Sequence, residues 1–290
     1  MSNPASPLDP RTHAFRPDLA DAALRATVTA ARYVEPSIRQ CVQGVIPLLA
    51  TPDPDARQVS QIRYGEFLDV FEIRMDGFAW VQNRIDRYVG YLPSAGTLRD
   101  AIADLSWRLG ALRSFVYPEP DLKSPPIDEL TLGSYIQPGE KRGNFTALPG
   151  GGFVFTAHIV GAEAALTPDY AFTAGRLLNT PYLWGGRTPK GIDCSGLVQL
   201  ALEMAGIESP RDSDQQREAF GQPLSRHWRD TPWKRGDLVF MKDDRGAPHV
   251  GIMTNSDHMI HATASVMSVV VEPLFDVVLR GVEILAAGRP

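Results

Sequence analysis

Residues 191–206 read GIDCSGLVQLALEMAG, and this stretch decides the fold of the last part of the chain. Its apolar residues fall on one face of a helix, namely Leu197, Val198, Ala201, Met204 and Ala205. Asp193 can accept hydrogen bonds from the first free backbone N–H groups, and Gly206 suits the end of the last turn. The sequence therefore predicts a helix that begins at Cys194, with the thiol at its N-terminal end.

A thiol in this position is a candidate nucleophile. Backbone N–H groups and the positive end of the helix dipole stabilise a thiolate, so we expect the pKa of Cys194 to lie below the usual value of ~8.5. Gly191 and Gly196 flank the thiol, and we expect them to leave the sulfur side open. The alternative is a cysteine used as a small buried hydrophobe.

From Thr167 onward, helical and extended segments alternate. The stretch TPDYAFTAGRLLNTP (residues 167–181) begins with Thr and Pro, as helices often do, and ends at a second Pro. Four later segments are typical of consecutive antiparallel strands: DLVFM, HVGIMT, MIHATA and SVVVEP. This pattern predicts an α+β module over residues 165–290.

Two histidines lie in neighbouring predicted strands. In HVGIMT, Val250 and Ile252 would face the core, so His249 and Gly251 would face the other way, with Gly251 leaving space beside the imidazole. His261 shares that face only if the turn contains an odd number of residues. A turn of three would set His249 diagonal to His261, opposite residue 263, and a turn of five would set the histidines directly opposite.

Cys194, His249 and His261 together predict base-assisted nucleophilic catalysis. His249 would take the thiol proton, and His261 would fix its tautomer and orientation. Each histidine alone would be read as a half-buried surface residue, but the pair favours function. A zinc site made by the same three residues is the alternative, yet no CxxC or HxxxH spacing supports it. We expect no metal and no cofactor.

The composition is that of a soluble protein with several modules. Of 290 residues, 43% are apolar and 22% are charged, and the formal charge of -5 gives no basic field for nucleic acid. We find no apolar run that could span a bilayer, no basic amphipathic helix and no secretory signal pattern. Having only Cys41 and Cys194 is typical of a reducing compartment. We expect a cytoplasmic protein with a small partner and no membrane contact.

Short predicted strands precede the α+β module. Over residues 31–96, apolar stretches such as EFLDVFEI and FAWVQNRI alternate with turn residues, as in a small barrel. Residues 97–164 begin with a helix-like segment, LRDAIADLSWRL, and then repeat the barrel pattern. We interpret these stretches as two tandem barrels, preceded by a lead-in segment over residues 1–30.

Six motifs resemble those of the NlpC-type cysteine peptidase family, which has a papain-like fold. In order along the chain they are YLWGG, GIDCSGLV, SPRDSDQQ, a Gly-Asp-Leu-Val-Phe strand, HVGI and MIHA. The resemblance covers about residues 167–290. Two SH3-like barrels before such a domain look like bacterial recycling enzymes that cleave γ-D-glutamyl-diamino-acid bonds in murein peptides with a free N-terminal L-alanine. The resemblance implies that Cys194 attacks the γ-amide carbonyl, with His249 as base and His261 as orienting residue.

The resemblance also implies roles around the nucleophile. Tyr182 would join the Cys194 N–H in stabilising the oxyanion, and Trp184 would contact the substrate. The substrate ammonium would be bound by polar residues on both sides of the nucleophile and downstream, namely Asp193, Ser195, Arg211, Asp212 and Ser213. Asp193 is read equally well as a helix cap, and the PRDSD segment as a helix start.

In relatives, the first barrel lends an acid and a tyrosine that close the substrate pocket. Glu66 and Tyr88 match by position, although a shift of a few residues would make the tyrosine Tyr64 or Tyr91. We interpret Trp80 as barrel core.

Two other functions compete with this one. An exported, wall-remodelling endopeptidase would use the barrels to bind intact peptidoglycan, but the missing signal pattern argues against it. A non-catalytic binding module would lack Cys194, His249 or His261, and all three are present.

Overall fold

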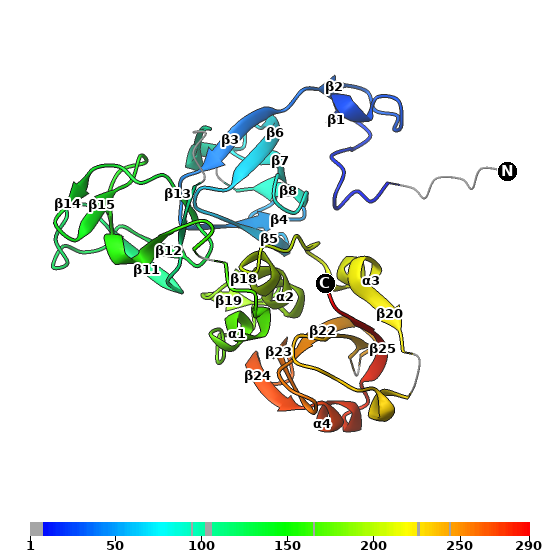
Figure 1. The fold of residues 1–290 in the computed structure, drawn as a ribbon. Coiled ribbons are helices and arrows are strands. Elements are labelled where there is room, and N and C mark those ends of the chain that lie inside the picture. Colours follow the sequence, from blue (N-terminus) through cyan, green and yellow to red (C-terminus); the bar gives the residue numbers. More distant parts are fainter. Residues whose placement is uncertain (1–7, 94, 102–105, 165, 225–226, 244) are drawn as a thin grey trace. The chain divides into compact units, whose positions relative to one another are not determined.

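The structure is a computed structural model, and it describes residues 8–93, 95–101, 106–164, 166–224, 227–243 and 245–290 (Figure 1). The chain divides into two compact units, Met1–Asp104 and Leu105–Pro290. No helix within these described ranges is long and apolar enough to cross a membrane.

The first unit contains an SH3-like barrel made of an antiparallel sheet in the order β5-β4-β8-β7-β6-β3-β9. The strands are β3 (Ser37–Cys41), β4 (Val45–Leu49), β5 (Gln58–Arg63), β6 (Phe67–Ile73), β7 (Ala79–Asn83), β8 (Val89–Leu92) and β9 (Leu98–Asp100). Because side chains alternate between the faces of a strand, one set forms a buried core that includes Cys41, Ile62 and Leu68. The sequence predicts this barrel correctly.

The segment after this barrel is extended, although the sequence predicts a helix. β9 pairs with β3, and Trp107–Leu109 forms β10 of the second unit, whereas residues 102–105 of the expected helix lie outside the described residues. The helix prediction is wrong for both strands because pairing with distant strands overrides a local pattern. The first sheet therefore extends beyond Gly96, where we expected the barrel to end.

The residues before the barrel fold against the outer face of its sheet. They include two short parallel strands, β1 (Ala20–Asp21) and β2 (Tyr33–Val34), and the 3-10 helix η1 (Ala22–Leu24). Arg16 lies over the ring of Trp80, with 4.3 Å between the guanidinium carbon and the ring centroid. This cation–π contact joins the lead-in segment to β7.

The lead-in segment buries Trp80 of β7. Its neighbours Ala79 and Val81 belong to the barrel core, so strand alternation turns Trp80 to the opposite face. There it packs with Leu19 and Phe71, and it is only 2% exposed. Trp80 is therefore a buried core residue, as we interpreted it, but its core lies between the sheet and the lead-in segment and not in the barrel interior.

The second unit begins with two small antiparallel sheets, where the sequence predicts the second barrel. Their orders are β13-β10-β17 and β12-β11-β16-β15-β14. The remaining strands of this part are β11 (Arg113–Tyr117), β12 (Asp128–Thr131), β13 (Tyr135–Ile136), β14 (Lys141–Arg142), β15 (Phe145–Ala147), β16 (Phe153–Phe155) and β17 (Ile159–Gly161), with the 3-10 helix η3 (Thr156–His158). Leu132 extends from this part into the core of the module that follows.

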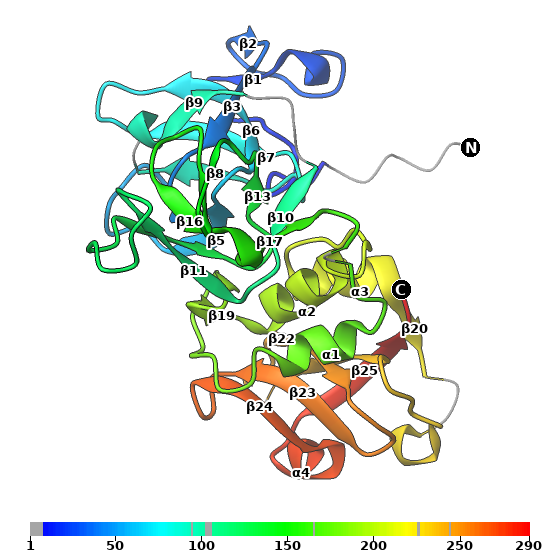
Figure 2. The same cartoon turned by 60° about the vertical axis from the view of Figure 1, so that its left-hand side comes forward.

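The rest of the second unit is the predicted α+β module, with a six-stranded sheet in the order β20-β25-β21-β22-β23-β24 (Figure 2). The strands are β20 (Gly221–Pro223), β21 (Leu238–Lys242), β22 (Pro248–Met253), β23 (His258–Thr263), β24 (Ser268–Pro273) and β25 (Glu283–Gly288), and β18 (Arg187–Thr188) pairs with β19 (Gly191–Ile192). The four strands predicted from the sequence are β21 to β24, and they are neighbours as expected.

Helices cover both faces of this sheet (Figure 2). α1 (Tyr170–Gly175) and α2 (Cys194–Glu203) share one core with the sheet, and α4 (Leu274–Leu279) shares another on the opposite face. α3 (Ser213–Phe220) leads into β20. The helix predicted from residue 167 is shorter than expected. It begins after Asp169, which caps it by accepting from Phe172 N at 3.1 Å, and it ends at Gly175. This arrangement brings the start of α2 to β22 and β23.

Candidate active site

The predicted nucleophile lies at the first residue of α2. Asp193 is the N-cap, and its Oδ1 accepts a hydrogen bond from Gly196 N at 2.7 Å. Gly206 follows the last turn with a φ of 76°, a left-handed conformation that glycine adopts without strain. Both predicted helix ends are therefore confirmed.

Gly191 and Gly196 allow close backbone packing and do not expose the thiol, as we had expected them to. A Cβ on Gly196 would collide with the backbone oxygen of Gly186, and a Cβ on Gly191 would lie 2.7 Å from the Cβ of Leu183. They admit the preceding loop against the start of α2, and they do not open the sulfur, since Cys194 is only 8% exposed. The expectation of an open thiol was wrong.

The electrostatic environment of Cys194 also differs from the prediction. Burial raises the pKa of Cys194 to about 12, and the negative charge of Asp193 adds to the rise. The backbone N–H groups of Val250 and Ser195 and the guanidinium of Arg211 oppose it. The expected lowering of the thiol pKa is wrong for this closed site, because desolvation outweighs the contribution of the helix end.

The two predicted histidines are hydrogen-bonded to each other. His249 Nε2 and His261 Nδ1 lie 2.8 Å apart, with the ring centroids separated by 5.1 Å. Thr254 N donates to His258 O, which leaves three residues, 255–257, in the turn between β22 and β23. The structure therefore has the shorter of the two turns considered from the sequence, the one that sets the histidines on a diagonal.

His249 is uncharged at neutral pH in this environment. Desolvation, followed by the electrostatic effect of the neighbouring His261 imidazole, lowers the pKa of His249 to about 3, while Glu272 opposes the shift. The thiol meets the same strand through Val250, the residue after His249. The resting site therefore pairs a neutral thiol with a neutral imidazole, and not a thiolate with an imidazolium.

Glu272 extends the histidine pair, and the sequence analysis missed it. Its Oε1 lies 2.7 Å from His261 Nε2, and Arg280 bonds both carboxylate oxygens at 2.6 and 2.8 Å. The hydrogen bond with His261 and that with Arg280 lower the pKa of Glu272 to about 2, against an opposing effect of burial. The available signal was a charged residue in SVVVEP, the strand expected to lie beside that of His261.

Asp193, Ser195 and Arg211 form one buried network. Arg211 Nη1 and Nη2 donate to the two oxygens of Asp193 at 3.0 and 2.7 Å, and Nη1 also donates to Ser195 Oγ at 2.9 Å. Gly185 N donates to Asp193 Oδ2 at 2.9 Å. The structure brings these three predicted residues together, with Asp193 acting as helix cap and counter-ion. Ammonium binding by this group stays a prediction.

Asp212 and Ser213 lie where α3 begins, as the helix-start interpretation predicts. Asp212 is the N-cap residue and Ser213 the first helical residue, and both are half-buried. Gln216, one turn further on, donates to Ser195 O at 3.0 Å. This hydrogen bond joins the start of α3 to the first turn of α2.

Tyr182 and Trp184 lie on the loop before β18. Tyr182 packs against the core that contains Cys194, and its backbone N donates to Met267 O at 2.9 Å. Burial, with a contribution from Cys194, raises the pKa of Tyr182, so its phenol stays protonated and able to donate. Trp184 is 56% exposed, so the loop that packs on the nucleophile helix carries an accessible indole.

The candidates from the first barrel belong to the other unit. Glu66 accepts from Arg63 Nε at 2.7 Å and from Asn83 Nδ2 at 2.9 Å. Tyr88 packs in the barrel core, and the hydroxyl of Tyr91 accepts from Arg16 at 3.0 Å. Tyr64 is also buried. Pocket closure by Glu66 and a tyrosine stays a prediction.

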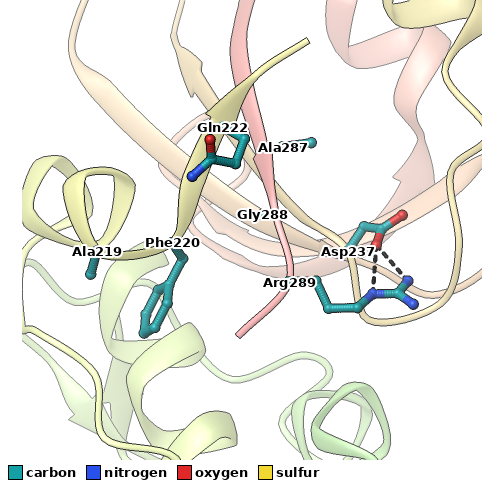
Figure 3. A pocket seen from close by; sticks show the side chains of 7 residues that line it. All are labelled: Ala219, Phe220, Gln222, Asp237, Ala287, Gly288 and Arg289. Carbon is teal, nitrogen blue, oxygen red and sulfur yellow. Dashed lines mark hydrogen bonds and ion pairs between the residues drawn. The ribbon is translucent and has the colours of Figure 1, made fainter. Parts of the chain in front are cut away.

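A separate pocket of about 500 Å³ lies near the C-terminal end of β25 (Figure 3). It is lined by Ala219, Phe220, Gln222, Asp237, Ala287, Gly288 and Arg289, and within it Arg289 Nε donates to Asp237 at 3.0 Å. The catalytic candidates are not among these lining residues. Within the described residues, no group of three or more His, Cys, Asp or Glu side chains could hold a metal ion.

Two family models match parts of the chain. Residues 179–279 match the NlpC/P60 family, and residues 48–96 match the bacterial dipeptidyl-peptidase Sh3 domain. An NlpC/P60 family protein from Bacillus cereus ATCC 10987 has a similar fold, with a TM-score of 0.69 at 19% identity over 87% of this chain and 99% of that chain.

Curated relatives add sequence similarity. Dipeptidyl-peptidase 6 of Lysinibacillus sphaericus is 29% identical over 237 residues, which cover 74% of this chain and 84% of the relative. The gamma-D-glutamyl-L-lysine dipeptidyl-peptidase of Bacillus subtilis (strain 168) is 33% identical over 36% of this chain and 34% of the relative. The murein DD-endopeptidase MepS/murein LD-carboxypeptidase of Escherichia coli (strain K12) is 40% identical over 29% of this chain and 43% of the relative. The chain thus spans less than half of the last two relatives.

Proposed function

Through residues 179–279 the chain belongs to the NlpC/P60 family of cysteine peptidases, and on this premise we propose that it hydrolyses the γ-D-glutamyl-diamino-acid amide bond of murein peptides with a free N-terminal L-alanine. The observation that carries the proposal is Cys194 at the first residue of α2, beside a strand that bears a hydrogen-bonded histidine pair. The names of the relatives and the match of residues 48–96 to the dipeptidyl-peptidase Sh3 domain support the choice of substrate.

The electrostatics of the site determine how the first step proceeds. A preformed thiolate is disfavoured, because burial raises the pKa of Cys194 to about 12 and desolvation lowers the pKa of His249 to about 3. The proton therefore moves from sulfur to His249 as the sulfur attacks the γ-carbonyl carbon, and the negative charge develops on the carbonyl oxygen. The Cys194 N–H and the Tyr182 hydroxyl stabilise this oxyanion.

The second half of the reaction reverses the roles. His249 gives its proton to the leaving amine of the diamino acid as the C–N bond breaks, which leaves a thioester on Cys194. Water, deprotonated by His249, then attacks the thioester and releases L-Ala-γ-D-Glu with the thiol restored. His261 keeps the imidazole of His249 oriented through both steps, at the 2.8 Å separation found in the structure.

Recognition of a free N-terminus needs a carboxylate that the substrate ammonium can reach. We assign the ammonium contact to Asp193 and the groups bonded to it, Ser195 and Arg211. Asp212 and Ser213, at the start of α3, would complete this contact. We also propose that the reaction serves peptide recycling in the cytoplasm, which the low cysteine content of the sequence supports.

Mass spectrometry of products tests the proposal. L-Ala-γ-D-Glu-L-Lys and its N-acetylated form are incubated with the wild type and with Cys194→Ser. The wild type should release L-Ala-γ-D-Glu from the free peptide alone, and the variant should release nothing. Cleavage by Cys194→Ser would remove the nucleophile assignment, and equal rates on both peptides would reject recognition of the ammonium.

The E. coli relative favours a second function, cleavage of intact wall by an exported endopeptidase, because its name describes a murein DD-endopeptidase. Sedimentation with insoluble peptidoglycan separates the two functions. Recycling predicts that the protein stays in the supernatant and releases no soluble muropeptides. Co-sedimentation with release of muropeptides would favour the wall-remodelling function.

A further inference from the structure

Glu272 lies at the end of a line of hydrogen-bonded groups that starts at the histidine base. His249 Nε2 meets His261 Nδ1 at 2.8 Å, and His261 Nε2 meets Glu272 Oε1 at 2.7 Å. These three side chains come from the adjacent strands β22, β23 and β24. Glu272 is opposite Met259 in the β23–β24 ladder, which sets it diagonal to His261 on the same face.

The direction of each proton in this line follows from the chemistry of its last member. An ionised carboxylate only accepts hydrogen bonds, so the proton between Glu272 and His261 lies on Nε2 of His261. When His261 is neutral, its Nδ1 then has no proton and accepts from Nε2–H of His249. A neutral His249 that carries its proton on Nε2 has a free lone pair on Nδ1.

We propose that Glu272 is a positioning residue for the peptidase reaction proposed above, because its carboxylate sets the tautomers of His261 and His249 and leaves Nδ1 of His249 as the base. The proposal goes beyond the orienting role of His261. A histidine at that position can donate or accept through Nδ1, and only the group on its other nitrogen decides which.

Arg280 completes the arrangement from the end of α4. It donates to Oε1 and Oε2 of Glu272 at 2.6 and 2.8 Å, and so fixes the plane of the carboxylate. The charged and titratable side chains that face Glu272 are thus His261 from β23 and Arg280 from the end of α4. Together they keep the pKa of Glu272 at about 2, so the carboxylate stays an acceptor throughout the pH range of an assay.

Long-range ¹H–¹⁵N NMR of the imidazole rings tests the tautomers without reference to activity. His261 signals are identified by their loss in His261→Gln. In the wild type we expect a protonated Nε2 and an unprotonated Nδ1 on His261, and the same pattern on His249. A wild-type spectrum with a protonated Nδ1 on either ring would overturn the proposal.

Kinetics of Glu272→Met test the consequence for catalysis. Methionine keeps the length of the side chain but removes the acceptor, so His261 can take the opposite tautomer and force the proton of His249 onto Nδ1. With L-Ala-γ-D-Glu-L-Lys we expect the kcat of Glu272→Met to fall by about 10²-fold while KM changes little. The kcat of Glu272→Gln, whose amide oxygen still accepts, should lie between those of the wild type and Glu272→Met.

Glu283→Met is the matched control, because Glu283 lies in β25 with its side chain 65% exposed, beside Lys242 at 3.7 Å. It should leave kcat unchanged. A kcat of Glu272→Met within about twofold of wild type would overturn the proposal. A wild type that shows the expected tautomers but does not cleave the peptide would contradict the proposed function and leave the tautomer assignment standing.

Discussion

Arg211 donates hydrogen bonds to both carboxylate oxygens of Asp193, at 3.0 and 2.7 Å, and Asp193 is the residue directly before the nucleophile in the chain. The arginine side chain is 1% exposed and that of Asp193 is 10% exposed. The cap of the catalytic helix is therefore also half of a buried ion pair. Removing the arginine would leave a buried carboxylate without its counter-charge.

We predict that Arg211→Gln lowers the free energy of unfolding by about 3–5 kcal/mol, because breaking a buried ion pair from one side leaves an uncompensated charge. Urea unfolding measures the change. Arg235→Gln is the control, since Arg235 pairs with Asp169 at the surface, with side chains 46% and 48% exposed, and should cost less than about 1 kcal/mol. If the two variants lose equal free energy of unfolding, burial of the Arg211–Asp193 pair does not account for its contribution to stability.

The pH dependence of alkylation tests the state of the thiol. Because the pKa of Cys194 is raised to about 12, the thiolate fraction and the iodoacetamide rate should rise about tenfold per pH unit from pH ~7 to ~10. Peptide mapping by mass spectrometry distinguishes Cys194 from Cys41. A rate that levels off below pH ~8 would instead indicate a preformed thiolate–imidazolium pair.

The two histidines should differ in importance. His249→Ala removes the base itself, whereas His261→Asn and His261→Gln keep a polar group beside it, so we expect His249→Ala to reduce kcat by at least tenfold more. His158→Ala, in the second unit but bonded to Ser114, should leave kcat unchanged. Equal losses at positions 249 and 261 would count against this ranking.

Gly196 offers a test in which two effects have opposite signs. Helix propensity alone would make Gly196→Ala stabilising by about 1 kcal/mol, but the new Cβ would collide with the backbone oxygen of Gly186. We expect a net destabilisation of about 1–3 kcal/mol and loss of activity, because the loop that bears Tyr182 must move. Gly161→Ala, with open space around its Cβ, should leave both properties unchanged.

Local patterns in the sequence predicted the elements that carry the site. The apolar spacing after Cys194 and the alternation around His249 and His261 depend only on neighbouring residues, and the structure confirms the helix, the strands and the odd turn. The helix-like spacing around Leu98 failed because β9 gains its stability from pairing with the distant strand β3.

Properties that depend on contacts between distant segments were beyond the sequence. The thiol pKa follows from desolvation, which needs the packed site, and the pairing of Asp193 with Arg211 joins residues 18 positions apart. Glu272 acquires its role only once β23 and β24 are aligned in register. A sequence pattern gives the face of a strand, but not which side chain across the sheet it meets.

The contact between Arg16 and Trp80 has a practical consequence for shortened forms of the protein. A chain that begins at Val34 would keep every strand of the barrel from β3 onward but lose the residues that shield Trp80 and Phe71. The uncovered indole and phenyl rings would form an exposed hydrophobic patch, so such a fragment should self-associate or precipitate. Its intrinsic tryptophan emission should shift to longer wavelength as water reaches the indole.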